Sequence, residues 1–362
     1  MSFWDTITTL IGWDATKYQY FYIPTGQVEN PAPSIGTVVE SGKHYFQVFL
    51  SEMYLKKHRE WFKTWYPVVH TQIELQFGTQ IVELPHVAGP LQLEGVKETT
   101  LENVVQLNHA LTPLLPFNGG LVKLVSVLLA MEGKNTLQSF VKVMGDFSKL
   151  LIVPEVSAAL NLALPLANGV QDLLSGTNRE IDLGLHQSFT GAGGGGANVL
   201  KSGYYVVLKA EAGQYQSNLF QIRNDRLFYG PTAATKQPLT GVTYMLFRVD
   251  ARTERDDWAS LSTIKKAFLE ALKALESGNT EGAKMLLRKV LFQVRASDDL
   301  TKADQNRVVS TLIEEFKAAQ NQGLGLISFA ADPFLTAINN ATNVDVNSAL
   351  MNEPDIDDLL NF

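Results

Sequence analysis

The run Thr190-Gly-Ala-Gly-Gly-Gly-Gly196, followed by Ser202-Gly-Tyr-Tyr-Val-Val-Leu-Lys209, divides the chain into two differently patterned parts. The residues before the glycines are apolar and helix-like, whereas the residues after them are patterned like a β-strand. Ordering an uninterrupted glycine run costs the most backbone entropy, so the run predicts a flexible loop. We interpret this loop as a joint at the opening of a second β module, and its residues are Gly191, Gly193, Gly194, Gly195 and Gly196.

The same run places Gly191, Gly193 and Gly196 at the G-x-G-x-x-G spacing of a dinucleotide-binding turn. That motif lies between a strand and a helix, where its backbone amides approach a pyrophosphate. Here only five residues separate Gly196 from Ser202, and a strand-like run follows in place of a helix. The context therefore favours a loop and predicts no nucleotide cofactor.

The composition is that of an ordinary folded protein. The chain has 362 residues, 45% of them hydrophobic and 19% charged, which is enough for about two or three domains with a sizeable core. The absence of cysteine excludes disulfides, thiolate nucleophiles and cysteine-ligated metal sites. The N-terminal residues lack the basic region and cleavage site of a secretory signal, so we expect a cytoplasmic protein.

The net charge of −7 is concentrated near the C-terminal end of the sequence. No basic residue follows Lys317, whereas six acidic residues do: Asp332, Asp345, Glu353, Asp355, Asp357 and Asp358. The rest of the chain is close to neutral and lacks the concentrated basic surface that duplex nucleic acid requires. One group of arginines is expected to form a solvated sheet face: Arg223, Arg226, Arg248, Arg252 and Arg255.

Residues 1–98 are predicted to form an N-terminal β module that begins with a short amphipathic helix at residues 2–12. Turns rich in Pro, Gly and Asn separate strand-like runs at residues 18–23, 36–40, 44–50, 68–77 and 80–84. The last two runs, joined at Gly78-Thr79, predict a hairpin. Residues 52–65 predict a helix, and the module as a whole is expected to be a small sheet or sandwich.

Residues 99–178 have a different and unusually apolar pattern. It predicts helices at residues 101–114, 120–131, 136–151 and 154–174. Helices that are apolar on most faces must be buried in a core, against a partner or in a membrane. We expect burial in the core; the alternative is a membrane-active chain that releases residues 121–131 and 150–174 on activation.

Residues 179–255 return to β patterning and predict a second β module that contains the glycine-rich loop. Residues 256–325 predict a helical C-terminal region with helices at 264–275, 281–294 and 298–319, the second capped by Thr280. The expected fold class is therefore multidomain α+β. Two small antiparallel β modules are separated by an apolar helical region, and a helical C-terminal region and a flexible acidic tail follow.

Residues 326–362 are predicted to be an acidic, partly disordered tail. The last ten residues combine carboxylates with apolar side chains, as in a linear peptide that folds on a basic, apolar-floored groove. In outline they resemble the acidic, Phe-ended tails of bacterial single-stranded-DNA-binding proteins, and this resemblance assigns no partner. The alternative is a solubilising chain end. The expected partner-binding residues are Asp355, Ile356, Asp357, Asp358, Leu359, Leu360 and Phe362.

The sequence contains no recognisable catalytic constellation. Its six histidines are isolated, with no H-x-x-x-H or H-E-x-x-H pair that would place two imidazoles on one metal. We therefore predict no catalytic residue, no metal site and no cofactor. An active site assembled from distant residues stays open, and its candidates are His186 or His70 beside a carboxylate. The acidic cluster Glu254-Arg-Asp-Asp257 is expected to cap the helix that follows it.

These patterns indicate a non-catalytic, cytoplasmic interaction protein that recognises another protein, as an adaptor, regulatory subunit or assembly component. A homo-oligomer is compatible with this interpretation, whereas a complex with duplex nucleic acid is not. The alternatives are a membrane-active or lipid-associating protein and a hydrolase with a non-local active site.

Overall fold

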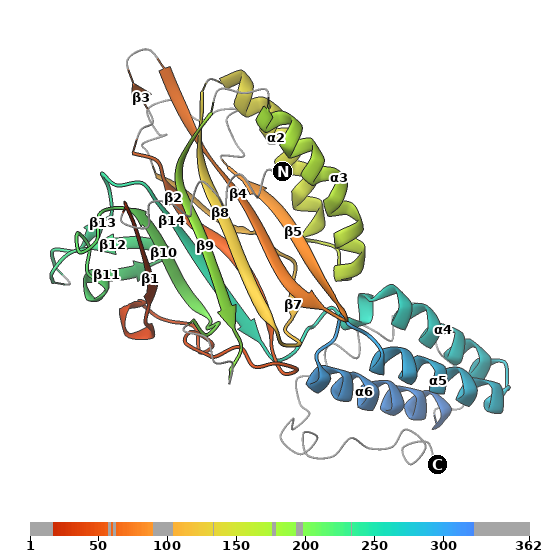
Figure 1. Ribbon diagram of the computed structural model, residues 1–362. Helices are drawn as coiled ribbons and strands as arrows, with labels where there is room; N and C mark the ends of the chain where they lie inside the picture. Colours follow the sequence, from red (N-terminus) through yellow and green to blue (C-terminus); the bar gives the residue numbers. More distant parts are fainter. Residues whose placement is uncertain are drawn as a thin grey trace. The chain divides into compact units, whose positions relative to one another are not determined.

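The computed structural model describes residues 17–56, 59–60, 63–89, 104–132, 134–175, 179–192, 198–232 and 234–321. The helix expected at residues 2–12 lies outside them. The fold is α+β, with antiparallel strand pairing and a set of helices (Figure 1). The chain forms two compact units, one of Met1–Ser41 with Phe46–Arg252 and one of Gly42–Tyr45 with Thr253–Phe362.

The first unit contains a six-stranded sheet whose strands come from both ends of the unit's sequence. Its pairings β1–β10, β10–β14 and β2–β6 are antiparallel, and β7 pairs with β2. The order across this first sheet is β1 (Tyr18–Ile23), β10 (Gly203–Lys209), β14 (Tyr244–Arg252), β2 (Tyr45–Tyr54) and β6 (Val104–Ala110), with β7 (Leu115–Pro116) off this path.

A five-stranded second sheet faces the first. Its strands are β3 (Arg59–Glu60), β4 (Lys63–Phe77), β8 (Leu121–Glu132) and β9 (Arg179–Thr190), with β5 (Gln80–Ala88) paired to β4. The predicted hairpin at Gly78 is confirmed, and this glycine has φ +58°, a left-handed conformation that glycine adopts without steric cost.

A third, three-stranded sheet consists of β11 (Phe220–Arg223), β12 (Arg226–Tyr229) and β13 (Gln237–Pro238). Asn224 and Asp225 form its first turn, both at positive φ, as a tight hairpin requires. Short 3-10 turns lie at Thr25–Gln27 (η2) and Ser217–Leu219 (η4). The strand expected at residues 36–40 is reduced to one isolated bridge between Val38 and Lys201.

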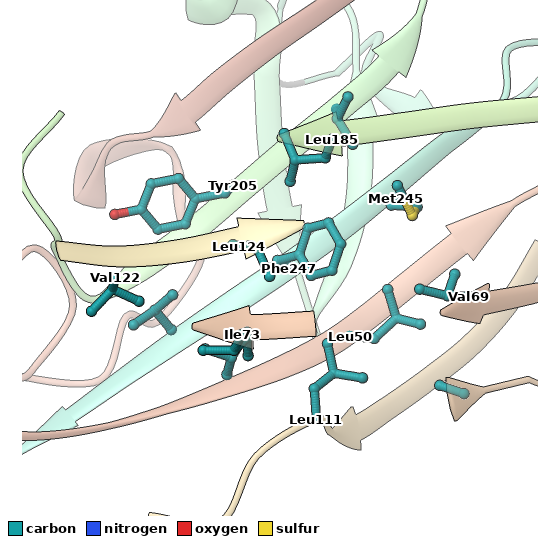
Figure 2. Packing of buried hydrophobic residues seen from close by; sticks show 14 of the residues in the cluster. Leu50, Val69, Ile73, Leu111, Val122, Leu124, Leu185, Tyr205, Met245 and Phe247 are labelled. Carbon is teal, nitrogen blue, oxygen red and sulfur yellow. The ribbon is translucent and has the colours of Figure 1, made fainter. Parts of the chain in front are cut away.

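The main core lies between the first and second sheets. Leu50, Met245 and Phe247 of the first sheet meet Val69, Leu124 and Leu185 of the second, and all six are buried (Figure 2). Two helices, α2 (Lys134–Leu150) and α3 (Val156–Ser175), cover the outer face of the second sheet (Figure 1). These helices confirm the predictions at residues 136–151 and 154–174.

Strand β8 explains why the pattern of the apolar region at residues 99–178 wrongly predicted a helix at residues 120–131. Its side chains alternate between the two cores: Leu124 and Leu128 pack between the sheets, whereas Val127 and Leu129 face the helices. A strand buried on both faces is apolar at nearly every position, so its periodicity does not distinguish it from a buried helix. The predicted helices at residues 101–114 and 120–131 are therefore wrong, and these residues contain β6 and β8.

The expected separation of two β modules by a helical region is also wrong. Strand β1 pairs with β10, and β2 lies beside β14, so strands from before and after the helices share one sheet. The boundaries drawn at 98/99 and 178/179 consequently fall inside one compact unit. The helix predicted at residues 52–65 is wrong for the described residues of this range, because β2 continues to Tyr54, β3 is Arg59–Glu60 and β4 begins at Lys63.

The second unit is built around three helices, α4 (Ser262–Glu276), α5 (Thr280–Arg295) and α6 (Lys302–Asn321), preceded by the 3-10 turn η5 (Trp258–Ser260). They confirm the three helices predicted after residue 256. The N-cap of α5 is Asn279, whose Oδ1 accepts a hydrogen bond from the Gly282 amide at 3.0 Å, in place of the predicted Thr280. Trp258, Phe268, Leu287, Val290 and Phe316 are among the buried residues of its core.

We predict that Leu128→Ala lowers the free energy of unfolding by about 2–5 kcal/mol, because it opens a cavity at a fully buried position of β8. The matched control is Leu121→Ala at the start of the same strand, where the side chain is 50% exposed and the loss is expected to stay below about 1 kcal/mol. Urea denaturation measures both values. Equal losses would contradict the assignment of Leu128 to the core.

Candidate functional site

The glycine run connects the two facing sheets. Strand β9 ends at Thr190, whose amide donates to the Asn198 carbonyl at 2.9 Å and whose carbonyl accepts from the Leu200 amide at 2.8 Å. These bonds close the base of the loop. Gly191 has no room for a side chain, because a Cβ there would lie 2.5 Å from the Phe117 ring. Glycine at position 191 therefore allows the backbone to pass close to the Phe117 ring. The other four residues of the predicted loop, Gly193, Gly194, Gly195 and Gly196, lie outside the described residues.

The tail predicted to bind a partner also lies outside the described residues. This applies to all seven positions: Asp355, Ile356, Asp357, Asp358, Leu359, Leu360 and Phe362. Their role in binding a partner stays a prediction.

Three histidines of the first unit lie close together. His86 on β5 and His109 on β6 approach with their Nε2 atoms 2.9 Å apart, and the charge of His70 on β4 also acts on His86. Burial lowers the pKa of His70 to about 3, and burial followed by the charges of its two neighbours holds the pKa of His86 well below its usual range. Neutral imidazoles that share a hydrogen bond fit this environment.

The hydrolase hypothesis gains nothing from these histidines. His70 and His186 lie on β4 and β9, with β8 between them, and His186 is exposed. Among the described residues, no group of three or more His, Asp or Glu side chains is placed to hold a metal ion. The buried side chains of His70 and His86 form part of the packed interior of the first unit.

We predict that acid destabilises the first unit through these imidazoles. The unfolded chain protonates them below about pH 6.5, whereas folded His70 stays neutral down to about pH 3. Their contribution to stability is therefore complete above pH 6.5 and is lost as the pH falls towards 3, at roughly 1.4 kcal/mol per pH unit for each buried imidazole.

Urea denaturation between pH 7 and pH 4 tests this dependence. His70→Leu is expected to flatten the loss of stability in this range, and His186→Leu, at the exposed histidine, is expected to leave the slope of the native chain. A slope that His70→Leu does not change would contradict the assignment of the pH dependence to His70.

Three of the five arginines expected to form a solvated face, Arg226, Arg248 and Arg255, pair with carboxylates, whereas Arg252 is exposed as expected. Arg226 Nε donates to buried Glu52 at 3.0 Å, and the same carboxylate accepts from the Leu227 amide at 2.7 Å. Arg248 donates to Asp225 at 3.0 Å and to Asp250 at 3.3 Å. Buried carboxylates without such donors would cost several kcal/mol, so these pairs hold β2, β12 and β14 in their places.

The second unit has its own buried charge cluster, centred on Asp304 of α6. Asp304 Oδ1 accepts from Arg307 Nε at 2.6 Å. Its Oδ2 accepts from the Tyr45 hydroxyl at 2.7 Å and from the Arg255 amide at 3.2 Å. Burial, followed by the charge of Asp304, raises the pKa of Tyr45 far above its usual range. Tyr45 is therefore a permanent donor that fixes residues 42–45 to the helices.

The cluster Glu254-Arg-Asp-Asp257 has a different role from the one predicted. Asp257 makes no side-chain capping bond at η5. Its two oxygens instead accept from Arg255 Nε at 2.7 Å and from Arg255 Nη2 at 2.8 Å. Arg255 is buried, and burial favours this pairing because an unpaired guanidinium would lose its hydration. Asp257 does occupy the N-cap position of η5, as predicted, but its carboxylate neutralises an arginine and makes no bond to the amides of the turn.

A pocket of about 400 Å³, part of it open solvent, adjoins this network. Most of its lining surface is apolar, and its polar residues include Glu254, Asp304 and Arg307. Both oxygens of Asp304 already accept hydrogen bonds within the protein. The carboxylate is thereby committed to holding the unit together, and the pocket offers it little freedom to act on a ligand.

We predict that Asp304→Asn destabilises the second unit by about 3–5 kcal/mol, because it leaves the buried guanidinium of Arg307 without its closest carboxylate and removes the charge to which the Tyr45 hydroxyl and the Arg255 amide donate. The control is Asp256→Asn at an exposed position, where the change is expected to stay within about 0.5 kcal/mol. Amide hydrogen exchange in α4, α5 and α6 reports this unit directly. Unchanged protection in Asp304→Asn would contradict a structural role for the cluster.

The exposed surface of α5 is the strongest candidate for recognition. Met285 is 69% exposed and Phe292 is 62% exposed, and the two are separated by two helical turns. Arg288 and Lys289, also exposed, lie between them. We call these four residues the outward face of α5. Each is three or four positions from its neighbours, so their side chains form one continuous patch.

The outward face of α5 lies opposite the face that builds the core. The buried residues of the helix are Ala283, Leu287, Val290, Leu291 and Val294. At 100° per residue this buried stripe is centred about 180° from the patch. Met285 and Phe292 therefore do not contribute to the core of the unit. The sequence carried this signal, since the two residues lie on the polar side of the predicted helix at residues 281–294.

The surface chemistry of this patch suits an acidic and apolar ligand. Lys284 and Arg295 add to its basic character, and Glu281 is the one acidic residue of α5. Large apolar side chains set among cations are typical of surfaces that bind protein segments. Lone exposed apolar residues are ordinary, but here two large ones lie two turns apart on the same helical face, with two cations between them.

The membrane alternative loses one of its two proposed segments. Residues 121–131 belong to β8, most of whose side chains, from Val122 to Met131, are buried in the two cores of the first unit. Within the part of the chain that the structure describes, no helix combines the length and apolarity needed to cross a membrane.

Comparison with known proteins identifies no relative of this chain. No family model matches the sequence, and neither the curated proteins nor the solved structures show a significant match to it. The outward face of α5 is therefore the feature of the molecule that bears most directly on function.

Proposed function

We propose that this protein acts by protein–protein recognition, with the outward face of α5 as the binding surface for an acidic, apolar segment of a partner. The observation that supports this proposal is the exposure of Met285 and Phe292 on one face of a well-packed helix. The role of adaptor, regulatory subunit or assembly component fits this mode of action.

The energetics of such a surface favour binding by a few anchors. Burying Met285 and Phe292 against a partner contributes about 1.5–3 kcal/mol each. Arg288 and Lys289 add attraction to carboxylates, and this attraction is weak for each exposed pair and sensitive to salt. The apolar anchors would therefore set the affinity, and the cations would select acidic partners over basic ones.

The test is affinity capture with the full chain as bait. Phe292→Asp is expected to reduce recovery of a specific partner at least tenfold, because it replaces an apolar anchor with a charge that repels acidic ligands. The matched control is Ile81→Asp, which makes the same kind of change at a 71% exposed position on β5. It is expected to leave recovery unchanged.

Salt provides a second measurement on the same partner. Raising the ionic strength from about 0.1 to 1 M shortens the Debye length from about 10 to 3 Å and is expected to weaken the complex. A partner that is recovered equally by the native chain and by Phe292→Asp would reject the outward face of α5 as the binding surface.

A further inference from the structure

The C-terminal residues of this chain have the chemistry that the outward face of α5 selects. Residues 353–362 carry four carboxylates and no basic group. Four large apolar side chains lie among these carboxylates: Ile356, Leu359, Leu360 and Phe362. The outward face offers the complement, with two exposed apolar side chains beside two exposed cations.

The spacing within this segment matches a helical surface. Ile356, Leu359 and Leu360 occupy positions i, i+3 and i+4, which share one face of a helix. Asp355 and Asp357 would flank that apolar stripe on either side, at about 100° from Ile356. Such a segment can set its apolar stripe against Met285 and Phe292 while its carboxylates reach Arg288 and Lys289.

The length of the chain permits this contact within one molecule. More than 30 residues connect Asn321, the last residue of α6, to Asp355. At about 3.3 Å per residue they can span roughly 100 Å, whereas the 16 residues of α5 extend only about 24 Å. Tethering presents a segment at an effective concentration on the order of millimolar when the connection spans both sites. A contact within one chain is thereby favoured over one between two chains at micromolar protein.

We infer that residues 353–362 dock on the outward face of α5 of the same molecule and cover it until a partner with similar chemistry displaces them. This inference rests on the proposed function, because it assigns the first occupant of the same surface. It makes the tail a built-in competitor, so the affinity of the chain for a partner depends on the charge of its own C-terminal residues.

The test uses a fluorescent peptide of residues 353–362 and two forms of the full chain. In one form the tail is neutralised by Asp355→Asn, Asp357→Asn and Asp358→Asn, and the other form is native. We expect the peptide to bind the neutralised form about tenfold more tightly, because its own tail no longer competes. Neutralisation at Asp332→Asn and Asp345→Asn, outside the segment, is the matched control and is expected to behave like the native chain.

A second substitution locates the binding surface. Lys289→Glu in the neutralised chain is expected to weaken peptide binding at least tenfold, because it replaces an attractive charge with a repulsive one. Lys266→Glu makes the same change at an exposed position of α4 and is expected to have no effect. Amide exchange in α5 serves to verify that both variants stay folded.

The outcomes separate this inference from the proposed function. Equal peptide affinities of the native and neutralised chains would overturn docking within the molecule, whereas loss of binding in Lys289→Glu would still support the recognition surface. Absence of peptide binding to both forms would also overturn the inference, and partner capture with Phe292→Asp would then test the proposed function separately. Dimers at micromolar protein that require residues 353–362 would replace the contact within one molecule by a contact between two.

Discussion

The burial of β8 on both faces is the constraint on which the first unit depends. Leu124 and Leu128 require a covering sheet on one side, and Val127 and Leu129 require covering helices on the other. The first sheet meets the first requirement with strands drawn from residues 18–54 and 203–252. Helices α2 and α3 meet the second. Because apolar burial is the main favourable term in folding, this strand links distant parts of the sequence into one unit.

Charged residues complete each unit where apolar packing ends. Glu52 anchors β12 through Arg226 and the Leu227 amide, and Asp304 anchors residues 42–45 through Tyr45. A buried carboxylate is tolerated only when donors replace its hydration. The same groups would suggest chemistry if they were seen in the sequence alone. In the structure their hydrogen bonds are made to the protein itself, which indicates that they specify the fold.

The outward face of α5 differs from these clusters because its side chains do not contribute to the core of their unit. Helix α5 would pack equally well with polar residues at positions 285 and 292, since its buried stripe lies on the opposite side. The stability of the unit does not account for two large apolar side chains at these positions. Recognition of a segment such as residues 353–362 supplies an explanation that needs no further element of the fold.

Sequence patterns predicted the local structure where one periodicity dominated. The amphipathic helices α4 and α5 and the hairpin of β4 and β5 follow from spacing and turn residues. The same sequence patterns predicted a helix in place of β8, because burial on both faces removes the alternation of apolar and polar residues that identifies a strand. The pairing of β1 with β10 was also beyond prediction, since more than 180 residues separate their aligned partners and no local signal encodes such a contact. The outward face of α5 could have been identified from the sequence, since Met285 and Phe292 lie on the polar side of the predicted helix at residues 281–294.

The absence of native cysteine permits a direct measurement of the proposed contact, because a single introduced thiol carries a spin label without side reactions. A nitroxide at Asn361→Cys is expected to broaden the amide resonances of Met285–Phe292 in the native chain, and Lys289→Glu is expected to remove this broadening. Sharp α5 resonances in the labelled native chain, or broadening that survives Lys289→Glu, would contradict the account that the tail occupies the outward face of α5.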